Sequence, residues 1–407
     1  MENITLDNIS EIDIGLRIGT NLLRAGAEIK RVEQTITYIL SSYGAVNVDV
    51  FCIPSLILLS VEFNGDRRTT RIERNKIINI DLYRIEKFNS LSRYIALEKP
   101  SLDVVYEEIL KIESKKDYSF IILLFGALFS SFGFSLLFGG SFLDGLAAGI
   151  VGIIIYALNQ IKLKEQYATV HTLFCSLVGG LLCVLMTYIK LANNLSAVMT
   201  GAIMILIPGL MISTSIRDII IDDILSGSLR FLQSIFISLA IAAGFSIWTR
   251  IYGGDIALSM NDTLYIPIIG ALVGTFGFSL LFNSKYKRLP IVIIGGLITF
   301  TLYIILLKIA GLNPFFSNLI SAFTAGLLSE VLARLLKAPT TSFMLPSLIP
   351  LVPGASLFFT MYYLVNGDLG NFISTLMTTL LVILAIALGI VVSGVLFSLI
   401  LKKNNNK

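Results

Sequence analysis

The chain has 407 residues, of which 55% are hydrophobic and only 14% are charged, and its mean hydropathy is +0.83. Soluble chains carry about 25% charged residues, so the composition excludes an ordinary soluble protein, a disordered chain and a collagen-like chain. The net charge of +4 is too small for a nucleic-acid-binding surface, which needs a concentrated basic patch. Residues 1–117 hold 16 of the 31 Lys and Arg residues, and the apolar runs follow them.

Residues 1–117 are predicted to form a compact cytoplasmic α/β domain. Apolar residues recur at helical spacing in two segments that Gly26 separates, and two β-rich runs follow them. The turn sequence Asn64-Gly65-Asp66 predicts a hairpin between the second β-rich run and RRTTRI. Two more helices lead into the apolar part. The predicted helices are 9–25, 27–43, 81–97 and 102–115, and the predicted strands are 47–53 and 56–63.

From residue 118 onward, apolar runs of membrane-spanning length follow one another. A bilayer core needs about 20 apolar residues in a helix. The predicted spans are 118–138, 142–161, 170–190, 196–216, 230–249, 263–283, 289–308, 316–336, 343–365 and 376–400. We therefore expect an α-helical polytopic membrane protein with ten transmembrane helices.

The distribution of basic residues predicts that both termini are cytoplasmic. If the spans alternate from a cytoplasmic N-terminus, the cytoplasmic side carries twelve Lys and Arg residues and the opposite side carries three. The twelve are Lys162, Lys164, Arg217, Arg230, Lys285, Lys287, Arg288, Arg334, Lys337, Lys402, Lys403 and Lys407. The three are Lys190, Arg250 and Lys308. This asymmetry also supports the count of ten spans.

The apolar part contains an internal repeat. SSFGFSLLFG (130–139) recurs as GTFGFSLLFN (274–283) at an offset of 144, and LIPG (206–209) recurs as LVPG (351–354) at an offset of 145. The predicted repeats, 118–249 and 263–401, contain five spans each. Because five is odd, the second copy enters the bilayer from the opposite face. Such inverted repeats are typical of secondary transporters, whose substrate site lies at the midplane between the repeats.

Two spans contain helix-breaking Pro-Gly pairs near their centres: Pro208-Gly209, and Pro353-Gly354 after two further prolines. Proline removes a backbone donor, and broken backbone at membrane depth is tolerated where protein or a wet cavity satisfies it. The exposed amides of a half-helix can bind a carboxylate, and the freed carbonyls can bind an ammonium group. The predicted substrate site consists of Pro208, Gly209, Thr214, Pro350, Pro353 and Gly354. The alternative is that these kinks serve packing alone.

Charged residues are rare in the predicted spans. Glu330 lies in the eighth span one turn before Arg334, and Asp218 closes the fourth span. An intramembrane carboxylate is costly and is by default a functional candidate. We therefore predict that Glu330 and Asp218 take part in proton coupling. The alternatives are an interfacial ion pair for Glu330 and a solvated loop for Asp218.

Several motifs resemble those of the threonine/serine exporter family, ThrE. In the N-terminal domain the match is LLRAGAEIKRVEQTI (22–36), followed by DVFCIPS (49–55) and LSR (91–93). In the apolar part it is IPG…RD…D…SG…R (207–230) and EVLARLLKAPTTSFMLPSLIPLVPG (330–354). The motif residues of the N-terminal domain are Gly26, Glu28, Arg31, Glu33, Pro54 and Arg93. The resemblance extends over about residues 10–400.

The resemblance implies a multi-pass protein of the bacterial inner (cytoplasmic) membrane that exports threonine and serine with the proton motive force. Its expected partners are a small-molecule substrate, protons and the lipid bilayer, and a homo-oligomer is left open. A dicarboxylate exporter, similar to relatives linked to succinate export, is the first alternative. The predicted spans lack an obvious cluster of basic residues for two carboxylates, which favours amino acids.

A membrane-anchored hydrolase and a channel are the remaining alternatives. The N-terminal region contains no histidine and no GxSxG motif, and its one cysteine, Cys52, lies on a predicted strand. Nucleophilic catalysis needs a nucleophile beside a base, so we expect no enzyme activity. Three cysteines are too few for a disulfide framework, and the single histidine, His171, excludes a His-rich metal site. We expect neither a metal nor a cofactor. A channel would not need duplicated, broken helices.

Overall fold

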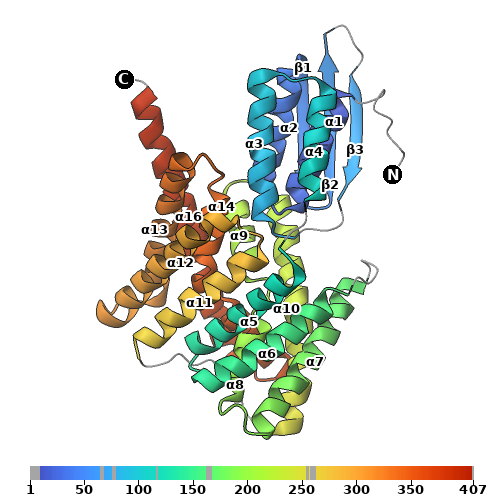
Figure 1. The fold of residues 1–407 in the computed structure, drawn as a ribbon. Coiled ribbons are helices and arrows are strands. Elements are labelled where there is room, and N and C mark those ends of the chain that lie inside the picture. The colour runs from blue at the N-terminus through green and yellow to red at the C-terminus, as the bar shows by residue number, and fades with distance from the viewer. Residues whose placement is uncertain are drawn as a thin grey trace. The chain divides into compact units, whose positions relative to one another are not determined.

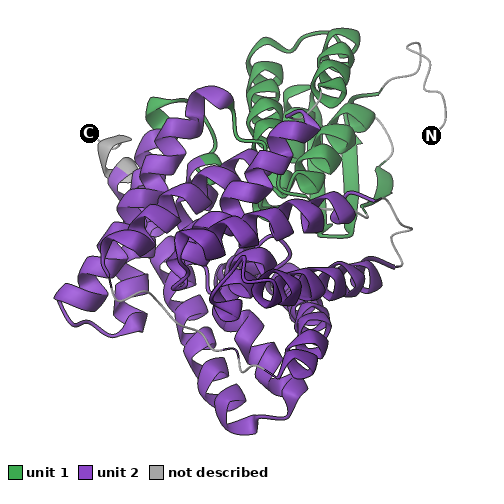
Figure 2. Ribbon diagram, turned by 60° about the horizontal axis from the view of Figure 1, so that its bottom comes forward, with its two compact units in different colours: residues 1–117, 282–285, 333–342 green, residues 118–281, 286–332, 343–407 purple. Residues whose placement is uncertain are grey.

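The computed structural model (Figure 1) describes residues 10–64, 68–75, 79–115, 118–161, 167–253, 256 and 263–405. The chain forms two compact units, which Figure 2 colours separately. Unit 1 comprises residues 1–117, 282–285 and 333–342, and unit 2 comprises the rest. Some residues of the predictions lie outside the described part: Gly65 and Asp66 of the hairpin turn, Lys162, Lys164 and Lys407, and the side chains of Lys402 and Lys403.

Unit 1 contains the predicted helices and strands of the N-terminal region. They are α1 (Glu11–Arg24), α2 (Ile29–Ser42), β1 (Ala45–Ile53), β2 (Leu56–Phe63), β3 (Thr69–Arg74), α3 (Leu82–Glu98) and α4 (Leu102–Ser114). Helix α1 begins where Ser10 and Asp13 form a reciprocal capping box, which satisfies two amides at the helix start. Gly26 ends the turn after α1 with a φ of +81°, a conformation that favours glycine.

The core of unit 1 lies between a three-stranded antiparallel sheet and the helices. The strand order is β1-β2-β3. Ile57, Leu59 and Val61 alternate along β2 and are buried, as expected for a strand with one covered face. Helices α1 and α2 pack on the sheet, α3 packs against both of them, and α4 packs against α1 and α3. This arrangement is the compact α/β domain that the helical segments and β-rich runs predict.

The chain after residue 117 is helical throughout its described part. The helices are α5 (Phe120–Leu137), α6 (Phe142–Asn159), α7 (Ala168–Tyr188), α8 (Leu195–Ile203), α9 (Gly209–Ile220), α10 (Ile224–Tyr252), α11 (Tyr265–Leu281), α12 (Leu289–Ile304), α13 (Pro314–Leu335), α14 (Thr341–Leu348), α15 (Gly354–Asn366) and α16 (Leu369–Asn405). Three short turns adjoin them: η3 (Tyr286–Arg288), η4 (Ile305–Ile309) and η5 (Ile349–Leu351).

Among the described residues, 7 helices are long and apolar enough to cross a membrane, or 8 if the bent pair around Pro353 is one span. A polytopic helical membrane protein is therefore supported. Two of the ten predicted spans fall short for visible reasons. Helix α11 has 17 residues, and α8 and α9 are two short helices on either side of a break. The count of ten spans stays a prediction.

The two FGFSLLF copies run through α5 and α11, which cross with their backbones in contact. A Cβ on Gly133 would lie 2.5 Å from the carbonyl oxygen of Gly270, and a Cβ on Gly277 would lie 2.6 Å from that of Gly126. At the repeat offset of 144, these two contacts are the same contact made twice. Because the partner's number falls as the residue number rises, α5 and α11 are antiparallel. Small residues are what such a close helix crossing requires.

The correspondence continues into the next helix of each copy. The buried Ser131 hydroxyl occupies the place where a Cβ on Gly152 of α6 would lie. At the same offset, a Cβ on Gly296 of α12 would lie 2.7 Å from the buried Thr275 hydroxyl. An inverted repeat requires that the first helix of one copy be antiparallel to the first helix of the other copy, and that each pack against a matching second helix. The inverted arrangement of all five spans stays a prediction.

Candidate functional site

Two helices of unit 2 begin at the Pro-Gly pairs. Pro208 precedes α9 with φ −80° and ψ 46°, and Pro353 precedes α15 with φ −78° and ψ 47°. The following glycine is the first helical residue in both cases. The helical segments on the two sides of Pro353 bend by 51°. Proline cannot donate a hydrogen bond to the preceding turn. The helical path is therefore interrupted at equivalent positions of the two copies of the repeat.

The two interruptions lie against each other. A Cβ on Gly209 would overlap the Val352 side chain and would lie 3.5 Å from the Cα of Gly354. A Cβ on Gly354 would lie 3.2 Å from the Ile207 side chain. At the offset of 145, the Gly209–Val352 and Gly354–Ile207 contacts correspond to each other. The two breaks therefore meet through corresponding residues of the two copies.

The electrostatics of the breaks favour a negative group. The first amides of an α-helix have no intrahelical acceptor, and the helix dipole places partial positive charge at this end. Since α9 and α15 both begin here, two positive helix ends converge. Anions bind at such ends. The converging helix ends can therefore stabilise a carboxylate.

The remaining predicted substrate residues are placed around the breaks. Pro350 lies in η5, immediately before the second break, and is buried. The Thr214 hydroxyl donates to the Leu210 carbonyl oxygen at 2.8 Å, within α9. Its proton is thus used by the helix backbone in this conformation, while its oxygen keeps acceptor capacity.

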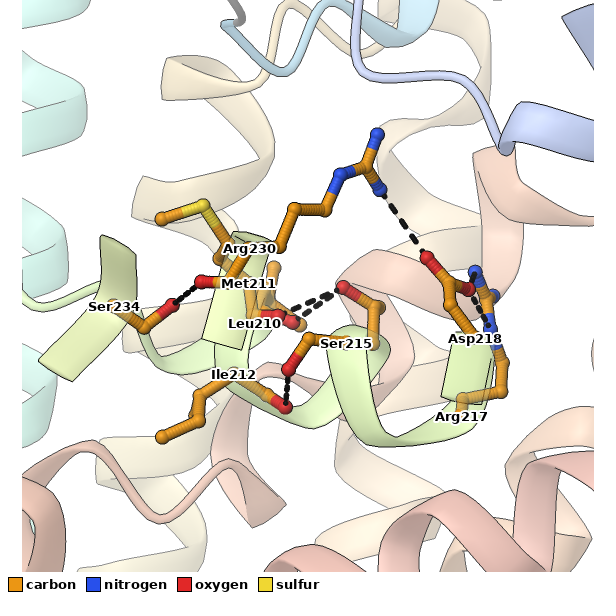
Figure 3. Close-up of polar contacts among 9 residues, drawn as sticks. Leu210, Met211, Ile212, Ser215, Arg217, Asp218, Arg230 and Ser234 are labelled. Carbon is orange, nitrogen blue, oxygen red and sulfur yellow. Dashed lines mark hydrogen bonds and ion pairs between the residues drawn. The ribbon is translucent and has the colours of Figure 1, made fainter. Parts of the chain in front are cut away.

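A buried charge cluster closes the other end of α9. The Arg217 guanidinium donates to Asp218 Oδ1 from Nε at 3.1 Å and from Nη2 at 2.6 Å. Arg230 Nη1, on α10, donates to Asp218 Oδ2 at 3.4 Å, as Figure 3 shows. The exposed fractions of the Arg217, Asp218 and Arg230 side chains are 6%, 4% and 8%. Buried charges need such partners, so this cluster ties α9 to α10.

The burial of Asp218 makes the alternative of a solvated loop wrong for this residue. Arg217 and Arg230 are also buried within helices, so these members of the twelve basic residues assigned to the cytoplasmic side are not exposed loop charges. Their charge alone favours a loop at the end of a span, because charged side chains are rarely buried without a partner. The spacing of 12 residues between Asp218 and Arg230 does not indicate an ion pair, since the two side chains meet only because α9 packs against α10. The remaining basic residues still outnumber those on the opposite side.

The other acidic residues of this part have different settings. Glu330 lies in the last two turns of α13 and is partly exposed. Asp144 caps α6 through Ser141 and also accepts the Asn193 and Asn194 amides at 2.7 and 2.9 Å. Asp144 therefore has a structural role, since it joins the start of α6 to the segment before α8. The proton-coupling role of Glu330 stays a prediction.

Two motif residues of unit 1 connect its helices to other elements. Glu33 of α2 accepts the Cys52 amide of β1 at 2.9 Å, which joins α2 to the sheet. Arg31 donates to Asn89 of α3 at 3.4 Å. These contacts fix the positions of α2 and α3 in the domain.

The other motif residues of unit 1 lie at turns or on the surface. Gly26 and Glu28 form the turn into α2, where Glu28 is the N-cap residue. The Pro54 carbonyl accepts from the Asn75 side chain at 3.1 Å, and Arg93 is exposed on α3. Within the described residues, no three His, Cys, Asp or Glu side chains gather into a possible metal site. The motif thus shapes the fold of unit 1, with Arg93 available at its surface.

Comparison with known proteins gives relatives over most of the chain. The protein named "Threonine/serine exporter" of Corynebacterium glutamicum is 21% identical over 377 residues, which cover 88% of this chain and 76% of that protein. "Pheromone-regulated membrane protein 10" is 20% identical over 83% of this chain in Kluyveromyces lactis and 24% identical over 83% in Debaryomyces hansenii. This chain covers only 37% and 35% of those yeast proteins. No solved structure matches.

Two family models divide the chain between them. The model of the threonine/serine exporter family, ThrE, matches residues 13–252, and a second model, "Threonine/Serine exporter, ThrE", matches residues 267–396. The first includes unit 1 helices and the first Pro-Gly break, and the second includes the other break. The chain therefore belongs to the threonine/serine exporter (ThrE) family, with both halves fused in one polypeptide.

Proposed function

We propose that this protein is a secondary active transporter that exports threonine and serine across a bacterial cytoplasmic membrane. Membership of the ThrE family supports an exporter, and the similarity to the Corynebacterium protein supports this substrate class. The proposed driving force is the proton motive force. The proposed topology has ten spans with both termini in the cytoplasm, and the N-terminal domain of residues 1–117 is cytoplasmic.

The contact between Gly209 and Gly354 carries this proposal. It brings two half-helix N-termini together from corresponding positions of the repeat. Two converging positive helix ends suit the carboxylate that every amino acid carries. Backbone carbonyls released before each break suit its ammonium group. We therefore place the substrate at Pro208, Gly209, Thr214, Pro350, Pro353 and Gly354.

Alternating access follows from the same relation. Two inverted repeats can exchange their conformations, so that the site opens first to one side and then to the other. Helix α9 is bounded by the break at one end and by the Asp218 cluster at the other. Movement of α9 would therefore change the setting of Asp218. Glu330 and Asp218 are the proposed proton-coupling residues.

Counterflow in proteoliposomes tests the proposal. Purified protein is reconstituted with unlabelled threonine inside, and uptake of labelled threonine, serine and succinate is measured. We expect saturable exchange of threonine and serine, and uphill export when a pH gradient is imposed. Absence of saturable exchange for all three compounds would contradict a transporter of this class.

A dicarboxylate exporter is the second candidate, and the buried arginines favour it. Arg217 lies near the end of α9, and Arg230 of α10 joins it at Asp218, so that two basic side chains are buried close to the helix that begins at the break. They share the Asp218 carboxylate, so their charge is at least partly compensated. Saturable succinate exchange that threonine does not inhibit would establish this second candidate.

A further inference from the structure

The connection between α11 and α12 contributes residues 282–285 to unit 1. These residues contact the start of α3. The Leu82 amide donates to the Phe282 carbonyl oxygen at 2.9 Å, and the Tyr83 amide donates to the Asn283 carbonyl oxygen at 3.2 Å. The first amides of a helix cannot find acceptors within it. The connection thus satisfies the first two amides of α3.

Side chains strengthen this joint. Asn283 Nδ2 donates to Asp81 Oδ1 at 3.1 Å, and Lys285 Nζ donates to Glu86 Oε1 at 2.7 Å. The Glu86 side chain is only 6% exposed. A buried carboxylate that loses its cation is strongly destabilising. Separating the connection from α3 would therefore expose two helix amides and disrupt a buried ion pair.

The first repeat makes the same turn without the docking side chains. Asn283 has a φ of +53°, and Gly139, its equivalent at the offset of 144, has a φ of +85°. Both are left-handed, a conformation that glycine and asparagine tolerate best. The residue equivalent to Lys285 is Ser141. The turn therefore needs neither side chain for its own conformation, and the docking groups belong to the second copy alone.

We propose that this contact is a permanent joint through which the N-terminal domain moves with the second repeat during export and controls it. The proposal rests on the proposed function, because it assumes that the repeats move. The domain belongs to the first family model, whereas the connection belongs to the second. A permanent joint would therefore let the N-terminal domain, which belongs to the first half of the chain, restrain the position of the connection between α11 and α12. A ligand that restrains the domain would slow that part of the second repeat.

A reversible cross-link tests whether the joint stays closed. Cys52, Cys175 and Cys183 are replaced by alanine to give a cysteine-free parent, and Glu86→Cys and Lys285→Cys are added. Threonine counterflow is measured before bridging, after bridging with a short reducible bis-methanethiosulfonate reagent, and after reduction. Before bridging we expect about five-fold slower exchange, the equivalent of about 1 kcal/mol.

Bridging should restore exchange to the level of the cysteine-free parent, and reduction should slow it again. If the bridged protein is inactive and reduction restores exchange, the joint must open in each cycle and the proposal is wrong. Equal exchange in all three states would also overturn it, because the contact would then have no influence on transport.

Hydrogen exchange gives a readout that does not depend on transport. Asn283→Gly keeps the left-handed turn but removes the contact with Asp81, and Gly139→Asn is the matched control in the first repeat. We expect faster exchange of the Leu82 and Tyr83 amides in Asn283→Gly alone. Unchanged protection would contradict the joint. A parent that carries none of the tested compounds would contradict the proposed function, while the exchange data would still test the joint.

Discussion

Gly209 lies against Gly354, so that a Cβ on Gly209 would be 3.5 Å from the Cα of Gly354 and would overlap the Val352 side chain. The two glycines open half-helices from the two halves of the chain. Any side chain at either position therefore enters the contact between the breaks. The effect of a substitution at Gly209 on transport should therefore depend on the size of the neighbouring Val352 side chain.

The first prediction uses this dependence. Gly209→Ala should slow threonine export, because overpacking costs about 1–3 kcal/mol. Val352→Ala in the same chain should restore it, since the obstructing methyl group is then absent. Labelled-threonine efflux from vesicles measures both effects. Gly394→Ala is the control, because nothing lies within 4 Å of a Cβ at that position. Failure of the second substitution to rescue the first would mean that the glycine is needed for another reason.

The second prediction concerns Glu330 in α13. Glu330→Gln keeps the shape of the side chain but cannot bind or release a proton. Threonine–threonine exchange should persist, whereas uphill export driven by a pH gradient should disappear. Both modes are measured in the same vesicles, and Glu330→Asp should keep the uphill mode. Intact pH-driven export in Glu330→Gln would end the role assigned to this residue.

Much of the fold could be predicted from the sequence because its signals are local. Alternation along β2, the break at Gly26 and the long apolar runs each fix an element without knowledge of its partners. The two Pro-Gly pairs were visible for the same reason. Their mutual contact could only be expected from the repeat offset, which relates residues that are far apart in the chain.

The parts that could not be predicted depend on tertiary contacts. In the sequence, Arg217 and Arg230 resemble charges of exposed loops. Only the structure shows that both contact the buried Asp218 carboxylate. The docking of Asn283 and Lys285 on α3 joins residues about 200 positions apart, which no spacing rule connects. The two further amides that donate to Asp144, those of Asn193 and Asn194, come from a segment 49 and 50 residues later. Polar residues in apolar surroundings carry no pattern that identifies their partners.

The third prediction tests the inverted repeat. Ser141 follows α5, and Lys287 follows α11, so the inverted arrangement places them on opposite sides of the membrane. In a cysteine-free parent, a membrane-impermeant maleimide added outside intact cells should label Ser141→Cys and leave Lys287→Cys unlabelled. Lysed cells provide the control, because both sites should then react. Labelling of both cysteines in intact cells would refute the inversion.

The fourth prediction concerns the carboxylate shared by Arg217 and Arg230. Asp218→Asn should destabilise the protein by about 3 kcal/mol, because it breaks a buried ion pair by removing one partner. Thermal unfolding in detergent measures the loss. Asp222→Asn is the matched control, since Asp222 is exposed in the connection between α9 and α10 and should change the midpoint little. Equal midpoints for the two variants would contradict the structural role of the cluster.

The fifth prediction concerns acid stability of unit 1. Burial raises the pKa of Glu113, but hydrogen bonds from Arg17 at 2.9 and 2.5 Å and from Asn21 at 2.7 Å outweigh it and hold the pKa below 4.5. A lowered folded-state pKa adds stability above pH 4.5 that is lost as the pH falls through the folded-state value. Protection of α1 and α4 amides should therefore decrease on acidification below pH 4.5.

Glu113→Gln should remove this dependence. The variant should be less protected than the parent at pH 7, and the difference should shrink as the parent is acidified. Glu107→Gln, an exposed neighbour on α4, serves as the control and should follow the parent. Hydrogen exchange measured at several pH values decides the matter, and a constant difference between Glu113→Gln and the parent would contradict it.

The crossing of α5 and α11 has a mechanical consequence. Gly133 and Gly277 meet backbone atoms of the opposite helix, and two aromatic pairs pack across the same crossing, Phe129 with Phe276 and Phe134 with Phe278. Rotation of one helix against the other would therefore have to separate these ring pairs. Packed cores normally resist such motion, because interdigitated side chains must leave their wells together. The close backbone contact and the flanking rings thus favour α5 and α11 moving together as one rigid pair.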